Sequence, residues 1–197
     1  VSQEAYVDQS LDIEPGSVDL VIWPETALPD YTIYNPPGTE FDRIVNARYR
    51  HMFRTVMEHT GVPLVIGTPA YDYRIKDAFN TGAIVMPESL TVETYEKRFL
   101  VPFGERIPYA SVFGWLNWFD FGIATWKAGE RNVLLNTGST KFGMAVCLES
   151  VFPGVFRDFV QQGAEFHVVL TNDAWFGNTS SPYQHAEFAV FRAIETR

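Results

Sequence analysis

The chain has 197 residues, enough for one domain with a buried core, and 46% of them are hydrophobic. Aromatic residues make up 15%, which excludes a disordered acidic tail. Lys and Arg number 15 against 24 Asp and Glu, and the net charge of −9 with scattered basic residues argues against a nucleic-acid surface. One cysteine excludes an intramolecular disulfide and any cysteine-cluster metal site.

The expected elements follow one another as short apolar runs and amphipathic patterns. Strands are expected at 18–23, 63–68, 79–86, 91–97, 132–136, 141–146 and 166–170. Helices are expected at 39–59, at 153–162 and from 183 to the end, with a polar loop at 172–182. This alternation predicts an α/β fold with antiparallel hairpins and mixed sheets.

Both ends of the chain read as cuts within a longer protein. The first residues are polar and lack the apolar core of a signal peptide. No stretch approaches the roughly 20 apolar residues of a membrane-spanning helix. The last residues, AVFRAIETR, stop within a helical pattern. We therefore expect residues 1–197 to form a single, partial domain that is soluble by itself.

An aromatic segment, PYASVFGWLNWFDFGIATW, occupies residues 108–126 and contains Trp115 and Trp118. It is too short to span a bilayer. Trp and Phe clustered with few charges favour a membrane interface or a lipid-entry lid. An ordinary aromatic core segment is the alternative. Asn117 and Asp120 interrupt the apolar run, which favours a surface loop over a core.

Three residues with chemically useful side chains stand where predicted strands end. Glu25 follows the strand VDLVIW, Lys97 ends TVETYEK, and Cys147 follows KFGMAV. Catalytic groups in layered α/β folds lie where strands run out into loops. Together these residues suit acyl transfer: a thiolate attacks a carbonyl carbon, a carboxylate takes the thiol proton, and an ammonium stabilises the oxyanion. We expect Lys97 to favour the thiolate.

Each of the three residues also has an ordinary structural interpretation. A cysteine at the end of an apolar strand is commonly a small buried hydrophobe. Glu25 fits a surface loop, and Lys97 stands in the solvated run Glu96-Lys97-Arg98. Spacing alone does not join residues that meet only in space, so the residues by themselves leave these alternatives open.

The segments around the three residues narrow the choice. They are WPETALP, YEKRFLVPFGERIPY and GMAVCLESVFP, followed by LTNDAWFGNTSSPYQH. In this order they resemble the nitrilase, or carbon–nitrogen hydrolase, superfamily, which uses a Glu–Lys–Cys triad on an α-β-β-α sandwich. Within it they are similar to the bacterial apolipoprotein N-acyltransferases. The resemblance runs from about residue 18 to residue 197.

This resemblance implies an enzyme of the bacterial inner membrane with its catalytic domain facing the periplasm. Its reaction moves a fatty acyl chain from a phospholipid to the N-terminal amine of a diacylglyceryl-cysteine apolipoprotein, ping-pong through a thioester. Glu25 is then the general base, Lys97 the oxyanion stabiliser and Cys147 the nucleophile. No cofactor is implied. The membrane helices of such enzymes are absent from this chain.

The same resemblance assigns further residues. Glu105 and Glu149 match supporting glutamates, while Trp175 matches a position at the substrate-binding mouth. From chemistry alone, Glu105 balances the site's charge or orients Lys97; the alternative is a surface pair with Arg98 or Arg106. Glu149 is expected to bind backbone amides after the nucleophile and to hold that turn.

Two functional questions stay open from the sequence. A soluble nitrilase-type amidase shares the triad but releases its acyl group to water, and an inert fragment or binding scaffold is a third possibility. The four histidines, His51, His59, His167 and His185, show no ligand spacing. We therefore expect no metal site and interpret each histidine as a structural or surface residue.

Overall fold

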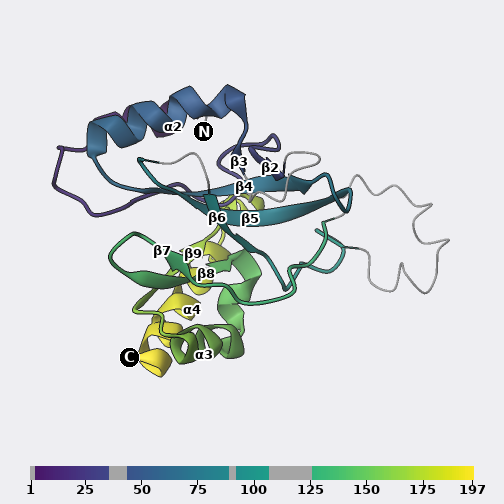
Figure 1. Ribbon diagram of the computed structural model, residues 1–197. Helices are drawn as coiled ribbons and strands as arrows, with labels where there is room; N and C mark the ends of the chain where they lie inside the picture. The colour runs from purple at the N-terminus through teal and green to yellow at the C-terminus, as the bar shows by residue number, and fades with distance from the viewer. Residues whose placement is uncertain (1–2, 36–43, 89–91, 107–125) are drawn as a thin grey trace.

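The computed structural model describes residues 3–35, 44–88, 92–106 and 126–197, which form two β-sheets between two pairs of helices (Figure 1). The first half comprises α1 (Gln3–Leu11), β1 (Val21–Ile22), β2 (Ile33–Asn35), β3 (Ile44–Val45), α2 (Ala47–Thr60), β4 (Leu64–Asp72), β5 (Asp77–Val85) and β6 (Val92–Glu96). The second half comprises β7 (Leu135–Asn136), β8 (Lys141–Val146), the 3-10 helix η2 (Cys147–Val151), α3 (Pro153–Gln162), β9 (Phe166–Leu170), the 3-10 helix η3 (Asp173–Phe176) and α4 (Ser181–Thr196).

Both sheets are mixed, as the sequence predicted. The larger has the order β3-β2-β4-β5-β6, with β1 also paired to β4, and the smaller has the order β7-β8-β9. The pairs β1–β4, β2–β4 and β8–β9 are parallel. The others, including the long β4–β5 hairpin, are antiparallel.

The layers follow the α-β-β-α order expected of a nitrilase-like sandwich, which confirms the predicted fold class. Figure 1 shows α2 above the larger sheet and α3 and α4 below the smaller one. The sheets pack closely: a Cβ on Gly82 of β5 would overlap the sulfur of Met144 on β8. One apolar cluster lies between the larger sheet and its helices, and a second fills the space between the sheets and α3. Strand ends of both sheets therefore meet at a common edge.

The predicted helix at 39–59 is wrong at its start. Residues 44–45 form β3, and residues 39–43 lie outside the described residues. The helix begins at Ala47 because the side chain of Asn46 accepts a hydrogen bond from the amide of Arg48 and caps it. It ends as predicted before Gly61, whose φ of 74° is easy only for glycine.

Helix α1, strand β2 and the 3-10 helices η2 and η3 were not predicted, and one prediction cannot be examined. The segment 172–182, predicted to be a loop, contains η3 and the first residues of α4, which begins at Ser181. Helix α1 has no clear apolar stripe, and β2 is only three residues long. Within the described ranges, no helix is long and apolar enough to cross a membrane. Residues 107–125, with Trp115 and Trp118, lie outside the described residues, so the lid hypothesis stays a prediction.

Candidate active site

Strands β1 and β2 both pair with the same edge of β4, and Glu25 lies in the segment between them. β1 pairs with the first residues of β4 and β2 with the last. Between them the chain leaves the sheet over Gly67, whose carbonyl accepts from the amide of Ala27 at 2.9 Å. A Cβ on Gly67 would lie 2.5 Å from the Cα of Glu25. The glycine therefore permits the close approach that places Glu25 at the strand ends.

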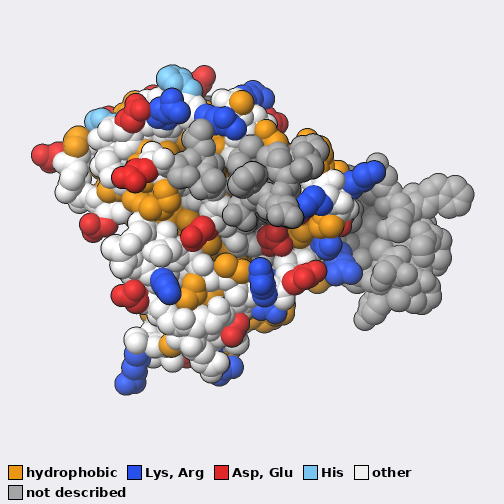
Figure 2. All heavy atoms as spheres, viewed as in Figure 1, with side chains coloured by type: hydrophobic (Ala, Val, Ile, Leu, Met, Phe, Trp, Pro, Cys, Tyr) orange, Lys and Arg blue, Asp and Glu red, His pale blue; other side chains and the backbone are white. Residues whose placement is uncertain are grey.

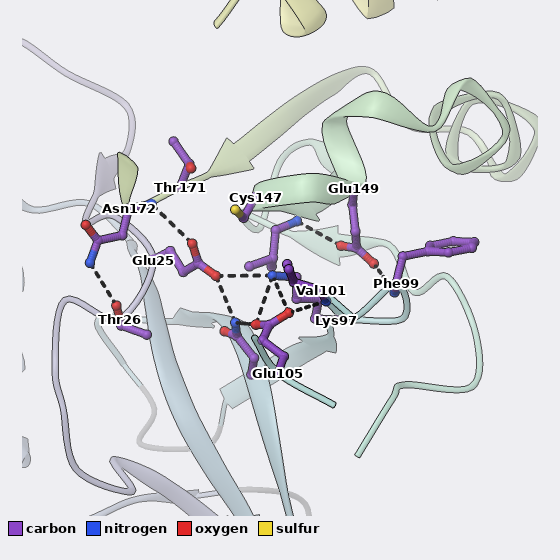
Figure 3. A network of polar contacts seen from close by, with 12 residues as sticks. Glu25, Thr26, Lys97, Phe99, Val101, Glu105, Cys147, Glu149, Thr171 and Asn172 are labelled. Carbon is purple, nitrogen blue, oxygen red and sulfur yellow. Dashed lines mark hydrogen bonds and ion pairs between the residues drawn. The ribbon is translucent and has the colours of Figure 1, made fainter. Parts of the chain in front are cut away.

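The three residues predicted from strand ends do converge (Figure 3). Glu25 follows β1, Lys97 follows β6 of the same sheet, and Cys147 follows β8 of the other sheet. The side chains of Glu25 and Lys97 are buried, at 7% and 1% exposure, and Cys147 is half-buried. Lys97 is therefore not part of a solvated charged run, and Glu25 is not a surface carboxylate.

Lys97 forms ion pairs with two carboxylates at once. Its Nζ lies 3.4 Å from Oε1 of Glu25 and 2.9 Å from Oε2 of Glu105. Burial lowers the pKa of Lys97, but the charges of Glu25 and Glu105 outweigh burial and raise it above its ordinary value. Lys97 is therefore a stable cation. Of the two expectations for Glu105, the structure supports the pair with Lys97 and not a surface pair with a neighbouring arginine.

Asn80, in the middle of β5, links the same two carboxylates. Its Nδ2 donates to Oε1 of Glu25 at 2.8 Å and to Oε1 of Glu105 at 2.7 Å. The amide of Val101 donates to Oε2 of Glu105 at 2.9 Å. Each carboxylate thus has neutral donors beside the ammonium of Lys97, as a buried carboxylate requires.

The loop after β9 binds the second carboxylate oxygen of Glu25. The backbone amide of Asn172 donates to Oε2 of Glu25 at 3.1 Å, and its side chain donates to Oγ1 of Thr26 at 3.2 Å. One carboxylate oxygen therefore faces Lys97 and Asn80, while the other faces Asn172. These contacts fix the orientation of the Glu25 carboxylate at the junction of the two sheets.

Cys147 has a strained backbone of the kind found at functional positions. Its φ is 53°, in the left-handed region that non-glycine residues avoid. Thr26, directly after Glu25, and Phe103, two residues before Glu105, are left-handed too, with φ of 49° and 60°. Left-handed residues thus lie at Cys147 or within two positions of Glu25 and Glu105, which are three of the residues that converge at the site.

The thiol of Cys147 is protonated at rest. Burial raises its pKa, and the charge of Glu25 raises it further. The charge of Lys97, a hydrogen bond from Thr171 and the backbone amide of Leu148 act in the opposite direction without outweighing them. Lys97 thus favours the thiolate, as expected, but burial and the charge of Glu25 outweigh its effect on the pKa of Cys147. Glu25 is the carboxylate that faces the sulfur in Figure 3.

Glu149 is a structural partner of both strand ends. It is completely buried, and its Oε1 accepts from the hydroxyl of Tyr95 and from the amides of Arg98 and Phe99. Its Oε2 accepts from the amide of Val146 at 2.8 Å. The bound amides thus precede the nucleophile and follow Lys97, instead of following the nucleophile as expected. Glu149 ties the Lys97 segment to the Cys147 turn.

Other site residues are less directly placed. Trp175 lies in η3, three residues after Asn172, and its side chain is 88% exposed. Its role in substrate binding stays a prediction, as do those of Trp115 and Trp118 outside the described residues.

Among residues 3–35, 44–88, 92–106 and 126–197, no group of three His, Cys, Asp or Glu side chains is arranged to hold a metal ion. On the face shown in Figure 2, acidic and basic side chains are interspersed.

Sequence reasoning missed Asn80, Asn172 and His185. Asn80 is the amide side chain inside a mostly buried and largely apolar strand, which is the signal that would have singled it out. Asn172 acts partly through its backbone amide, which has no sequence signature. His185 was interpreted as structural, and it is hydrogen-bonded as that interpretation requires: its Nε2 lies 3.1 Å from the carbonyl oxygen of Cys147.

Comparison with known proteins agrees with this geometry. The chain matches the carbon-nitrogen hydrolase family over residues 4–197. It is 35% identical over 185 residues to the apolipoprotein N-acyltransferase of Geobacter metallireducens, covering 92% of this chain and 33% of that protein. It is 33% identical over 203 residues to that of Chlorobaculum tepidum, covering 91% and 36%. The chain thus spans about a third of the length of these curated relatives.

Solved structures of the nitrilase superfamily share the fold. Nit3 of Saccharomyces cerevisiae superposes with a TM-score of 0.66 at 15% identity, covering 99% of this chain and 67% of that one. An amidase from Nesterenkonia superposes with a TM-score of 0.58 at 17% identity, covering 99% and 68%. The sandwich, the convergent strand ends and the family match lead to one conclusion: this chain belongs to the carbon-nitrogen hydrolase family.

Proposed function

We propose that this chain is the catalytic domain of an acyltransferase that moves a fatty acyl chain from a phospholipid to the N-terminal amine of a diacylglyceryl-cysteine apolipoprotein. The observation that supports it most is the ion pair of Lys97 with Glu25 beside the sulfur of Cys147. The choice of acyl transfer over other reactions of the fold rests on the similarity to named N-acyltransferases.

The first half-reaction loads the enzyme. Glu25 takes the proton of the Cys147 thiol, and the sulfur attacks the ester carbonyl of the phospholipid. Lys97 and the amide of Leu148 stabilise the oxyanion that forms. The carbon–oxygen ester bond then breaks, and Glu25 returns its proton to the departing lysophospholipid alcohol. The product is a thioester on Cys147.

The second half-reaction transfers the acyl group from Cys147 to the acceptor. The α-amine of the lipoprotein attacks the thioester carbonyl and gives a proton to Glu25. The oxyanion forms at the same place, so the same groups stabilise it. The carbon–sulfur bond breaks, and the sulfur recovers a proton from Glu25. Cys147 is again a thiol, and the acceptor has gained an amide bond.

The cellular setting is part of the proposal. Both substrates are lipids or lipid-modified proteins, so the membrane is the partner surface. The domain would face the periplasm from the bacterial inner membrane, with membrane-spanning helices supplied by sequence beyond residues 1–197. This placement rests on the proposed substrates.

Intact-mass measurement tests the proposal. The intact protein is incubated with phospholipid vesicles, and we expect one added acyl group that is absent in Cys147→Ala. A diacylglyceryl-cysteine peptide should then discharge the thioester and gain the acyl group. Discharge to water alone, or turnover of small amides without any lipid adduct, would instead identify a nitrilase-type hydrolase.

A further inference from the structure

Two side chains of helix α4 form hydrogen bonds with the turn that contains Cys147. Nε2 of His185 lies 3.1 Å from the carbonyl oxygen of Cys147 and 2.9 Å from Oγ of Ser150. Two turns further along the helix, Nη1 of Arg192 donates to the carbonyl oxygens of Ser150 and Val151 at 3.2 and 3.0 Å. The backbone of the turn from Cys147 to Val151 is thus held by two side chains of α4.

The contacts of His185 determine where its protons are. The carbonyl oxygen of Cys147 can only accept a hydrogen bond, so Nε2 must be protonated to bind it. Nδ1 lies 2.8 Å from Oδ1 of Asp173, an oxygen that already accepts from the hydroxyl of Thr171 at 2.8 Å.

The arrangement has the order of a Ser–His–Asp triad but not its accessibility. Ser150 is completely buried, and its hydroxyl lies beside the bond between His185 and the Cys147 carbonyl. No acyl group can reach an oxygen in that position. The hydroxyl serves instead as a second acceptor for Nε2.

We propose that His185 is a positioning residue for the nucleophile. Held against Asp173 through Nδ1, it donates from Nε2 to the carbonyl of Cys147 and holds that residue in its left-handed conformation. The sulfur then points toward Glu25, and the amide of Leu148 is aimed at the developing oxyanion. This inference rests on the proposed function insofar as Cys147 is its nucleophile.

Two isosteric variants separate positioning from packing. The amide of glutamine reaches about as far as Nε2, whereas that of asparagine reaches about as far as Nδ1. In the intact protein, His185→Asn should keep the Asp173 contact, lose the Cys147 contact, and slow thioester formation from phospholipid vesicles by roughly tenfold or more. His185→Gln should slow it by less than about threefold. Iodoacetamide alkylation of Cys147 should follow the same order.

A matched control comes from the opposite layer of the sandwich. Nε2 of His59 on α2 lies 2.9 Å from the carbonyl oxygen of Ile13, a similar contact far from the site in sequence. His59→Asn should leave both rates unchanged. Equal losses in the two His185 variants, in step with their melting temperatures, would show a packing role and overturn the proposal.

The readouts distinguish this inference from the proposed function. If the wild-type protein is alkylated at Cys147 but forms no thioester with any phospholipid, the acyltransferase proposal fails. The relative alkylation of His185→Asn and His185→Gln still decides the positioning role in that case.

Asp173→Asn provides a second test that does not depend on the folding of the His185 variants. The variant loses the carboxylate that holds Nδ1 of His185. Alkylation of Cys147 should therefore be slower than in the wild type, and an unchanged rate would contradict the proposal.

Discussion

Nδ2 of Asn80 lies 2.8 Å from Oε1 of Glu25, although the two residues are 55 positions apart in the chain. The same nitrogen lies 2.7 Å from Oε1 of Glu105, so one amide links the buried carboxylate of Glu25 to the partly buried carboxylate of Glu105, and both share the cation of Lys97. The site is therefore a four-member network in which the Glu25 carboxylate is restrained from several sides, by neutral as well as charged neighbours.

Replacing Asn80 with aspartate tests this network. Asn80→Asp exchanges the shared donor for a third acceptor with little change of shape. A hydrogen bond to a charged group is worth about 1.5–3 kcal/mol, so thioester formation should fall by roughly tenfold to a hundredfold. Asn136→Asp is the control, because Asn136 uses only its oxygen, which accepts from the amide of Gly138. A rate for Asn80→Asp near that of the control would remove Asn80 from the machinery.

Glu25→Gln should separate thiol acidity from catalysis. Burial and then the Glu25 charge raise the pKa of Cys147, so removing that charge should lower this pKa. Iodoacetamide alkylation should then reach its plateau at a lower pH than in the wild type, where the rate still climbs above about pH 8.5. Thioester formation should nevertheless be blocked, because the base is gone.

The exposed Glu58 on α2 provides the control for this pair of measurements. Glu58→Gln should change neither the pH profile nor the acylation rate. If Glu25→Gln raised the pKa of the thiol or left acylation intact, the general-base role would be untenable.

Lys97→Met should affect both stability and rate. The substitution leaves Glu25 and Glu105 without their cation in a buried place, which typically costs about 3–5 kcal/mol of unfolding free energy. Because the folded-state pKa of Lys97 is raised, its stabilisation is present at neutral pH and is lost only as pH rises above about 10.4. Urea unfolding at several pH values measures the loss of stability and its dependence on pH.

The rate effect of Lys97→Met identifies its chemical role. Loss of one oxyanion donor typically costs about 2.7–4 kcal/mol of transition-state stabilisation. We expect a fall of that size in acylation by folded protein. A loss of less than about tenfold would leave Lys97 as a structural charge only.

Glu149→Gln should destabilise the fold around the nucleophile. The two carboxylate oxygens accept from four donors, and a glutamine offers one oxygen and one NH₂ group that faces a donor. A buried donor without an acceptor costs about 1–3 kcal/mol, which denaturant unfolding would detect. Glu165→Gln is the matched control, since Glu165 is exposed and accepts one amide bond at 3.3 Å. Equal stabilities of the two variants would argue against the role of Glu149.

Gly67→Ala should displace Glu25. The added Cβ would lie 2.5 Å from both the Cα of Glu25 and the carbonyl oxygen of Pro24, so the backbone must move. Overpacking of this kind costs about 1–3 kcal/mol, and we expect acylation to fall with it. Gly154→Ala is the control, because nothing lies within 4 Å of its added Cβ. Wild-type acylation in Gly67→Ala would show that the approach of Glu25 to β4 is not required.

The sheets could be predicted from the sequence because their strands are long apolar runs. Residues 64–72, 77–85 and 141–146 are buried along almost their whole length, and their β-branched and apolar residues indicate this directly. β2 could not be predicted, since its three residues have no periodicity and are held by pairing with β3 and β4. Helix α1 likewise depends on packing against α2 and the core.

The site could be predicted only in its chemically distinctive members. Glu25, Lys97 and Cys147 stand at strand ends within recognisable segments, whereas Asn80 stands inside a strand and meets partners 55 and 25 residues away. The net pKa shift of Cys147 depends on depth of burial, which strand ends do not reveal. His185 contacts a carbonyl 38 residues earlier in the chain, a relationship set by the docking of α4.

The hydrogen bond from the amide of Asn172 to Glu25 joins residues that lie 147 positions apart in a chain of 197. The Glu25 carboxylate therefore acquires its final orientation only when the loop after β9 has packed against the segment that follows β1. A partly folded chain has the cysteine but not these neighbours, so the site depends on long-range contacts that local folding cannot supply.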